Sequence, residues 1–195
     1  MGNTRERILD ASTELFRRQG LAGTGIKQIL AAANAPFGSL YHHFPGGKDE
    51  LAAATISRAG QEYATLVAGK LLDGPDLPAN IRAAFASAAA TLVETDFADA
   101  CPIETVALEV ASTNEGLRQT IAEVFDSWHE GLTALLVSNG VSAEEAVALA
   151  HVILSALEGA FVFVRTTQRT DALLACGEAM ATLVEGALEA RPGRE

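Results

Sequence analysis

The chain has 195 residues, of which 49% are hydrophobic and 6% aromatic, and its net charge at pH 7 is −11. This length allows one or two domains with a substantial core, and abundant alanine and leucine favour packed helices over sheets. Composition alone argues against a nucleic-acid-binding protein, and no apolar run approaches the roughly 20 residues of a membrane span.

The charge is unevenly distributed along the chain. Residues 1–60 contain seven Lys and Arg against five acids, a net charge of +2, whereas the remainder contains seven against twenty, a net charge of −13. Only the first segment is therefore suited to approach phosphates. Cys101 and Cys176 lack metal-ligand spacing and are interpreted as reduced thiols of a cytoplasmic protein.

Three short helices are predicted at the N-terminus. Residues 4–19 have the apolar periodicity of an amphipathic helix, which Gly20 ends. Thr24 is expected to cap a second helix, and Asn34, which tolerates the left-handed conformation, to end it. Pro36 supplies the fixed φ that begins a third helix. Two helices joined by such a tight turn are typical of a helix-turn-helix.

Further helices are predicted beyond this segment, separated by breaker-rich stretches such as DGPDLP and Asn139-Gly140. No strand-like alternation or repeat is present, so the predicted fold class is all-α. The expected ranges are Lys48 to about Leu72, about 79–97, 102–111, 115–138, 142–168 and 171–189.

The third helix has two different faces. On a helical wheel, Leu40 and Phe44 form its buried stripe. The opposite face carries small side chains at its N-terminal end and polar side chains beyond it. Its residues are Gly38, Ser39 and His42, with Tyr41 on the flank. A glycine at the start gives a helix clearance to enter a major groove, and the polar groups are suited to base edges and phosphates. A solvated surface helix is the competing interpretation.

Lys48 follows Gly46-Gly47 and begins the next helix. Its ammonium group and the first backbone N–H groups of that helix are suited to bind one phosphate together.

The N-terminal sequence resembles the DNA-binding domain of TetR-family transcriptional regulators. The resemblance lies in TRERILDASTELF (4–16), GLAGTGIKQI (20–29) and APFGSLYHHFPGGK (35–48). The double glycine before Lys48, with CPIETVALE (101–109) and WHEGL (128–132), is similar to the LmrA- and YxaF-like branch. The resemblance implies a helix-turn-helix domain over residues 1–50 and a six-helix domain over 51–195 for effector binding and dimerisation.

The resemblance also implies site residues. The DNA contacts carried over are Thr24 at the cap of the second helix, Lys27, Ser39, Tyr41, His42 and Lys48. Phe37 stands where relatives commonly carry a basic residue; we interpret it as core packing, with contact to a thymine methyl as the alternative. The last two helices, which carry apolar stripes and small residues, are expected to form the joint of a homodimer on a palindromic operator.

An apolar effector cavity is the second implied site. Its candidate lining residues are Glu104, Trp128, His129, His151 and Phe161. The alternatives are a satisfied core histidine at position 151 and, at Glu104, a partner for a backbone end. Catalytic motifs are not found, so neither an enzyme nor a cofactor or metal is expected. The predicted function is a repressor released by a small apolar or aromatic effector. An activator, or a helical-bundle carrier or enzyme using the cavity, is the alternative.

Overall fold

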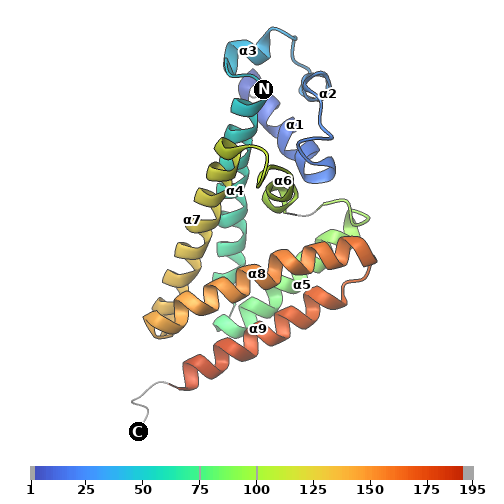
Figure 1. Ribbon diagram of the computed structural model, residues 1–195. Helices are drawn as coiled ribbons and strands as arrows, with labels where there is room; N and C mark the ends of the chain where they lie inside the picture. The colour runs from blue at the N-terminus through green and yellow to red at the C-terminus, as the bar shows by residue number, and fades with distance from the viewer. Residues whose placement is uncertain (1–2, 75, 100, 191–195) are drawn as a thin grey trace. The chain divides into compact units, whose positions relative to one another are not determined.

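The computed structural model describes residues 3–74, 76–99 and 101–190, and these residues form helices and no strand (Figure 1). The helices are α1 (Thr4–Gln19), α2 (Ile26–Ala32), α3 (Ser39–His43), α4 (Lys48–Leu72), α5 (Leu77–Glu94), α6 (Pro102–Val110), α7 (Glu115–Asn139), α8 (Ala143–Thr167) and α9 (Asp171–Glu189). The all-α prediction is confirmed, and the predicted helix ends lie within a few residues of those observed.

The helix ends have local causes. Gly20 ends α1 with a φ of 73°, and Asn34 follows α2 with a φ of 47°, as predicted from their tolerance of positive φ. A Cβ at Gly20 would overlap the carboxylate of Glu109, so a larger residue there would require that flexible side chain to move. Ser142 caps α8, because its hydroxyl accepts the N–H of Glu145 at 3.3 Å.

Packing divides the chain into two compact units. The first unit comprises Met1–Tyr63 and Asp99–Val124, and the second comprises Ala64–Ala98 and Phe125–Glu195. Residues 51–63 and 99–124 thus pack with the N-terminal helices, while the functional boundary at residue 50 stays a prediction.

In the first unit, α1 packs against α2, α3 and α6. Its core is built from side chains that the helical periodicity places inward. Those with less than 2% exposure include Ile8, Phe16, Ile29, Leu40, Phe44 and Leu51. The short helix α3 is thereby held by its two apolar residues, as predicted.

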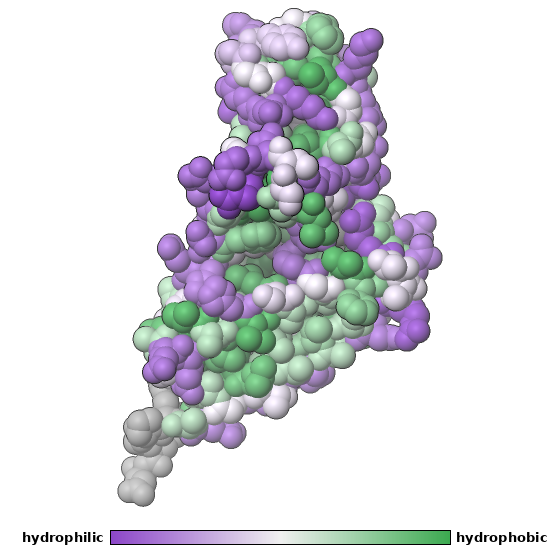
Figure 2. All heavy atoms as spheres, viewed as in Figure 1, coloured by the Kyte–Doolittle hydropathy of each residue, from purple (hydrophilic) through white to green (hydrophobic). Residues whose placement is uncertain are grey.

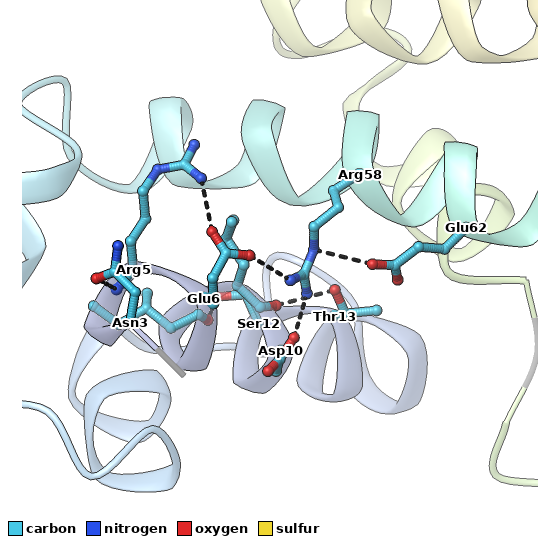
Figure 3. A network of polar contacts seen from close by, with 10 residues as sticks. Asn3, Arg5, Glu6, Asp10, Ser12, Thr13, Arg58 and Glu62 are labelled. Atoms are coloured by element: carbon cyan, nitrogen blue, oxygen red, sulfur yellow. Dashed lines mark hydrogen bonds and ion pairs between the residues drawn. The ribbon is translucent and has the colours of Figure 1, made fainter. Parts of the chain in front are cut away.

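A polar network joins α1 to α4 within this unit (Figure 3). The guanidinium group of Arg58 on α4 lies 3.2 Å from Glu6 and 2.7 Å from Asp10, both on α1, and 3.5 Å from Glu62 on its own helix. Arg5 also pairs with Glu6, at 3.3 Å. Arg58 therefore links α1 and α4, whose facing surfaces carry more acidic than basic side chains in this network.

In the second unit, α5 packs along α9, and α9 also packs against α8 (Figure 1). Gly177 marks the close approach of α5 and α9, because a Cβ there would lie 2.8 Å from the Cβ of Phe85. Arg82 on α5 bridges to Glu178 at 2.8 Å and to Glu185 at 2.9 Å on α9.

Helices α8 and α9 also carry an uncovered apolar surface, and apolar residues gather over this part of the unit in Figure 2. Helix α8 has a mean hydropathy of 2.1 over its most apolar 18-residue window, of which 28% is buried. Only its length and composition resemble those of a membrane-spanning helix, and a single helix of this kind is not a membrane span. Its exposed apolar residues are Val147, Val152, Val162 and Phe163, and those of α9 are Leu174 and Leu183.

Candidate nucleic-acid interface

The turn between α2 and α3 is held by an arginine of α1. The Nε of Arg7 donates a hydrogen bond to the carbonyl oxygen of Ala33 at 3.0 Å, and an Nη donates to that of Asn34 at 3.3 Å. These are carbonyl groups at the end of α2 that lack helical partners. Arg7 therefore fixes the point from which α3 departs. Sequence reasoning missed this role, because periodicity placed Arg7 on the outer face of α1.

Helix α3 exposes the face that the sequence predicts. Leu40 and Phe44 are buried, whereas Gly38, Tyr41 and His42 are exposed and Ser39 is half-buried. Gly38 has an ordinary helical φ of −64°, and a Cβ at this position would meet nothing within 4 Å. The packing and backbone of the protein therefore do not require glycine here, and open space lies in front of it.

Phe37 does not pack in the core. Its side chain is 58% exposed, and its ring lies edge-on to that of Tyr41, with centroids 6.4 Å apart. The preferred interpretation of Phe37 was wrong because the helical wheel was extended beyond the helix. Helix α3 begins at Ser39, and Phe37 lies in the preceding turn, where the wheel no longer fixes a side chain's direction.

Thr24 does not cap α2. The N-cap is Gly25, without a side-chain hydrogen bond. The Thr24 side chain is buried, and its hydroxyl donates to the carbonyl oxygen of Gly20 at 2.6 Å and accepts from Gln19 Nε2 at 3.2 Å. The hydroxyl turns back because the end of α1 offers carbonyl groups without helical partners. Thr24 thus shapes the loop before α2, whereas Lys27 is exposed on α2 itself.

Lys48 is half-buried, and its ammonium group donates to the carbonyl oxygen of Leu21 at 2.7 Å. The N–H of Gly46 donates to the carboxylate of Glu50 at 2.6 Å. Gly47 has a φ of 74°, which favours glycine. The predicted phosphate site at the start of α4 therefore already holds one internal carboxylate, and Lys48 retains two of its three donors for another partner.

Helix α6 is attached to the same unit at both of its ends. The carboxylate of Asp99, 7% exposed, lies 2.9 Å from the guanidinium group of Arg17 and 3.2 Å from that of Arg18. At the other end, the carboxylate of Glu109 accepts the N–H of Ala22 at 2.8 Å. These contacts were not predicted, since residues 80 or more positions apart give no local signal in one sequence.

The predicted effector residues are divided between the two units. Glu104 is half-buried in the first turn of α6, in the first unit, whereas the other candidates belong to the second. Trp128 and Phe161 are buried, and Trp128 packs edge-on to Phe125. The rings of His129 and His151 stack at 3.9 Å, and His129 Nε2 lies 3.1 Å from the carbonyl oxygen of Val147. His151 is exposed, so the interpretation as a core histidine was wrong.

A groove of about 630 Å³ does lie between α5 and α9 of the second unit. None of the predicted effector residues lines it. Its walls are the side chains of Ala79, Arg82, Ala83, Ala86, Leu174, Ala175 and Glu178.

Comparison with known proteins agrees with this architecture. Residues 8–55 match the family of bacterial regulatory proteins of the tetR type, and residues 78–179 match the C-terminal domain of LmrA/YxaF-like transcriptional regulators. The chain is 33% identical to the HTH-type transcriptional regulator YxaF of Bacillus subtilis (strain 168), over 94% of this chain and 96% of the relative. It is 31% identical to LmrA of the same organism, over 89% and 92%.

More distant proteins are also similar to this chain. The transcriptional repressor DhaR of Mycobacterium sp. (strain GP1) is 23% identical over 64% of this chain and 61% of its own. The crystal structure of a TetR transcriptional regulator from Legionella pneumophila superposes with a TM-score of 0.81, over 93% of this chain and 97% of that chain, at 23% identity. The chain thus belongs to the TetR family of bacterial transcriptional regulators, in its LmrA/YxaF-like branch, and it is a DNA-binding regulator and not an enzyme.

Proposed function

We propose that this regulator acts in the cytoplasm as a homodimeric repressor that binds a palindromic operator and is released by a small apolar or aromatic effector. Residues 1–50 read the DNA, and residues 51–195 carry dimerisation and effector binding. The observation that carries the proposal is α3: two buried apolar residues anchor it, and a small, polar and aromatic face is left open to the outside.

The exposed groups have distinct roles in this proposal. Ser39 and His42 hydrogen-bond to base edges or phosphates, and Tyr41 reaches a phosphate with its hydroxyl. Lys27 and Lys48 neutralise phosphates. Thr24 acts indirectly, by shaping the loop that places α2.

The uncovered surface of α8 and α9 supports dimerisation. Exposed apolar side chains at Val152, Val162 and Phe163 surround Gly159, where a Cβ would meet nothing within 4 Å. An apolar face of this extent, with small residues that permit close approach, is typical of a surface buried by a partner. A second copy of the same face would cover it with twofold symmetry and would place two reading helices for two half-sites.

Release requires an effector that binds the DNA-incompetent arrangement more tightly than the DNA-competent one, since equal affinity for both would shift nothing. Couplings of about 1–3 kcal/mol would weaken operator binding about 5- to 150-fold. The apolar or aromatic class of the effector is what the family resemblance implies, with Trp128, Phe161, His129 and His151 as the candidate contacts in the second unit. The repressor role is supported by the relative DhaR, which is named a transcriptional repressor.

Binding selection on random duplexes tests the proposal. The recovered sites should share an inverted repeat, and removal of the gene should raise transcription from a promoter that carries the repeat. Failure to enrich any duplex would overturn the DNA-binding role of α3. A fall in transcription would replace repression by activation.

A further inference from the structure

Two aromatic side chains stand out on the surface of the helix-turn-helix. Among residues 3–63, all of which are described, Phe37 and Tyr41 are the large apolar side chains that are exposed, at 58% and 53%. They are four residues apart, and their rings contact each other edge-on, with an interplanar angle of 60°. The proposed function uses the hydroxyl of Tyr41 but assigns nothing to the phenyl ring of Phe37.

The fold does not explain Phe37. More than half of its side chain lies outside the packing of the unit, while the neighbouring core positions are occupied by Leu40 and Phe44. An exposed phenyl ring gains little free energy of folding, because apolar stabilisation is proportional to the area removed from water. The apolar surface of the Phe37 ring is therefore available to be buried by a binding partner.

The ring is nevertheless positioned. The carbonyl oxygen of Phe37 accepts the N–H of Leu40 at 3.4 Å, and that of Pro36 accepts the N–H of Ser39 at 2.9 Å, so hydrogen bonds tie the turn that carries Phe37 to the start of α3. The edge-on contact with Tyr41 then restricts the ring from the side. At Gly38, which follows, a Cβ would meet nothing within 4 Å beyond its own chain neighbours.

The position of Phe37 in the helix-turn-helix limits what it can touch. The first residues of a reading helix are those that meet base edges in the major groove. A phenyl ring neither donates nor accepts a conventional hydrogen bond and carries no charge, so it recognises neither a phosphate nor the polar edge of a base. In the major groove, the apolar group that the four standard bases present is the C5-methyl of thymine.

We propose that Phe37 is a specificity-determining residue that packs against the C5-methyl of one thymine in each operator half-site, with Tyr41 holding its ring in place. This inference rests on the proposed function and adds to it a requirement for thymine at one position of the half-site. The inference also means that part of the affinity for the operator comes from an apolar contact, which salt does not screen.

Deoxyuridine substitution tests this directly, since it removes the C5-methyl group and keeps every hydrogen-bonding edge. Each thymine of a selected palindrome is replaced by deoxyuridine symmetrically in both half-sites, and the dissociation constant is measured by fluorescence anisotropy. For the wild-type protein, one position should weaken binding about fourfold per half-site, or about 15-fold in all, as expected for one buried carbon group. Cytosine placed there should bind more tightly when it is 5-methylated, by a similar factor.

Three variants complete the test. In Phe37→Ala the effect of deoxyuridine at that position should disappear, and in Phe37→Leu part of it should remain. Leu66→Ala is the matched control, because Leu66 is 57% exposed on α4, outside the helix-turn-helix; it should keep the full wild-type effect. If deoxyuridine affects wild-type and Phe37→Ala equally at every position, the inference is overturned and the proposed function stands. If no duplex binds the wild-type protein, both are overturned.

Discussion

The ammonium group of Lys48 lies 2.7 Å from the carbonyl oxygen of Leu21, so the lysine that we propose binds a phosphate also ties the start of α4 to the loop after α1. A lysine has three donors and uses one of them here. An internal anchor of this kind fixes the direction of the charge, and it reduces the side-chain entropy lost when a phosphate binds. In the proposed function the same residue thus contributes to both fold and DNA affinity.

Replacing Lys48 with alanine should therefore have two effects. Operator affinity should fall about tenfold at moderate salt, and the slope of log K against log salt should decrease by about two, because one phosphate contact is lost in each half-site. The free energy of unfolding should fall by about 1–2 kcal/mol through loss of the bond to Leu21. Anisotropy titrations at several salt concentrations and urea denaturation measure these quantities. Lys70→Ala, an exposed lysine in the last turn of α4, should change neither.

Gly38→Ala should separate folding from DNA binding. The φ of −64° and the open space at this position accept a methyl group, so stability should be unchanged or rise by about 0.5–1 kcal/mol. Operator affinity should fall at least tenfold, because the added methyl group stands between the helix and the groove. Gly69→Ala, in equally open space on α4, is the matched control and should bind as wild type. Wild-type affinity in Gly38→Ala would show that clearance at this position is not needed.

Arg7→Ala should loosen the turn before α3. It removes the hydrogen bonds that the charged guanidinium group donates to the carbonyl oxygens of Ala33 and Asn34. Hydrogen bonds of a charged group contribute about 1.5–3 kcal/mol each as an upper estimate. We expect the free energy of unfolding to fall by about 2 kcal/mol and hydrogen exchange in α2 and α3 to become faster. Arg118→Ala, which removes an exposed pair with Glu115 on α7, should leave the free energy of unfolding nearly unchanged, because solvent screens the pair. Equal losses in the two variants would mean that Arg7 does not hold the turn.

Gly159→Arg should dissociate the dimer without unfolding the protomer. Open space surrounds Gly159 in the described chain, so an arginine is accommodated there, whereas it would clash with a partner on the α8–α9 face and bring an unpaired charge into it. Sedimentation velocity should show a monomer at concentrations where the wild type is a dimer. Gly131→Arg, in similar open space on α7, should remain dimeric. If the Gly159→Arg protein is still a dimer, the dimer interface lies elsewhere.

Much of the fold is predictable from one sequence because its determinants are local. Apolar periodicity locates the helices, and Gly20 and Asn34 show where two of them end, since few other residues accept their positive φ. The buried Leu40 and Phe44 follow from the same periodicity.

The rest depends on contacts between distant residues. Nothing near Arg7 in the sequence indicates that it reaches Ala33, and nothing near Arg17 indicates Asp99. Thr24 shows the limit of local rules, since a threonine before a helix is a common cap, but here a carbonyl group of α1 competes for its hydroxyl. Phe37 was misplaced because the helical wheel was applied from position 37, whereas α3 begins at Ser39.

The stoichiometry of the complex tests the central claim most directly. Native mass spectrometry of the protein with a selected palindromic duplex should show two protomers on one duplex, and with a duplex carrying a single half-site the affinity should fall by at least a hundredfold. A single protomer bound with equal affinity to half-site and palindrome, or no complex with duplex DNA in dilute buffer, would contradict the account.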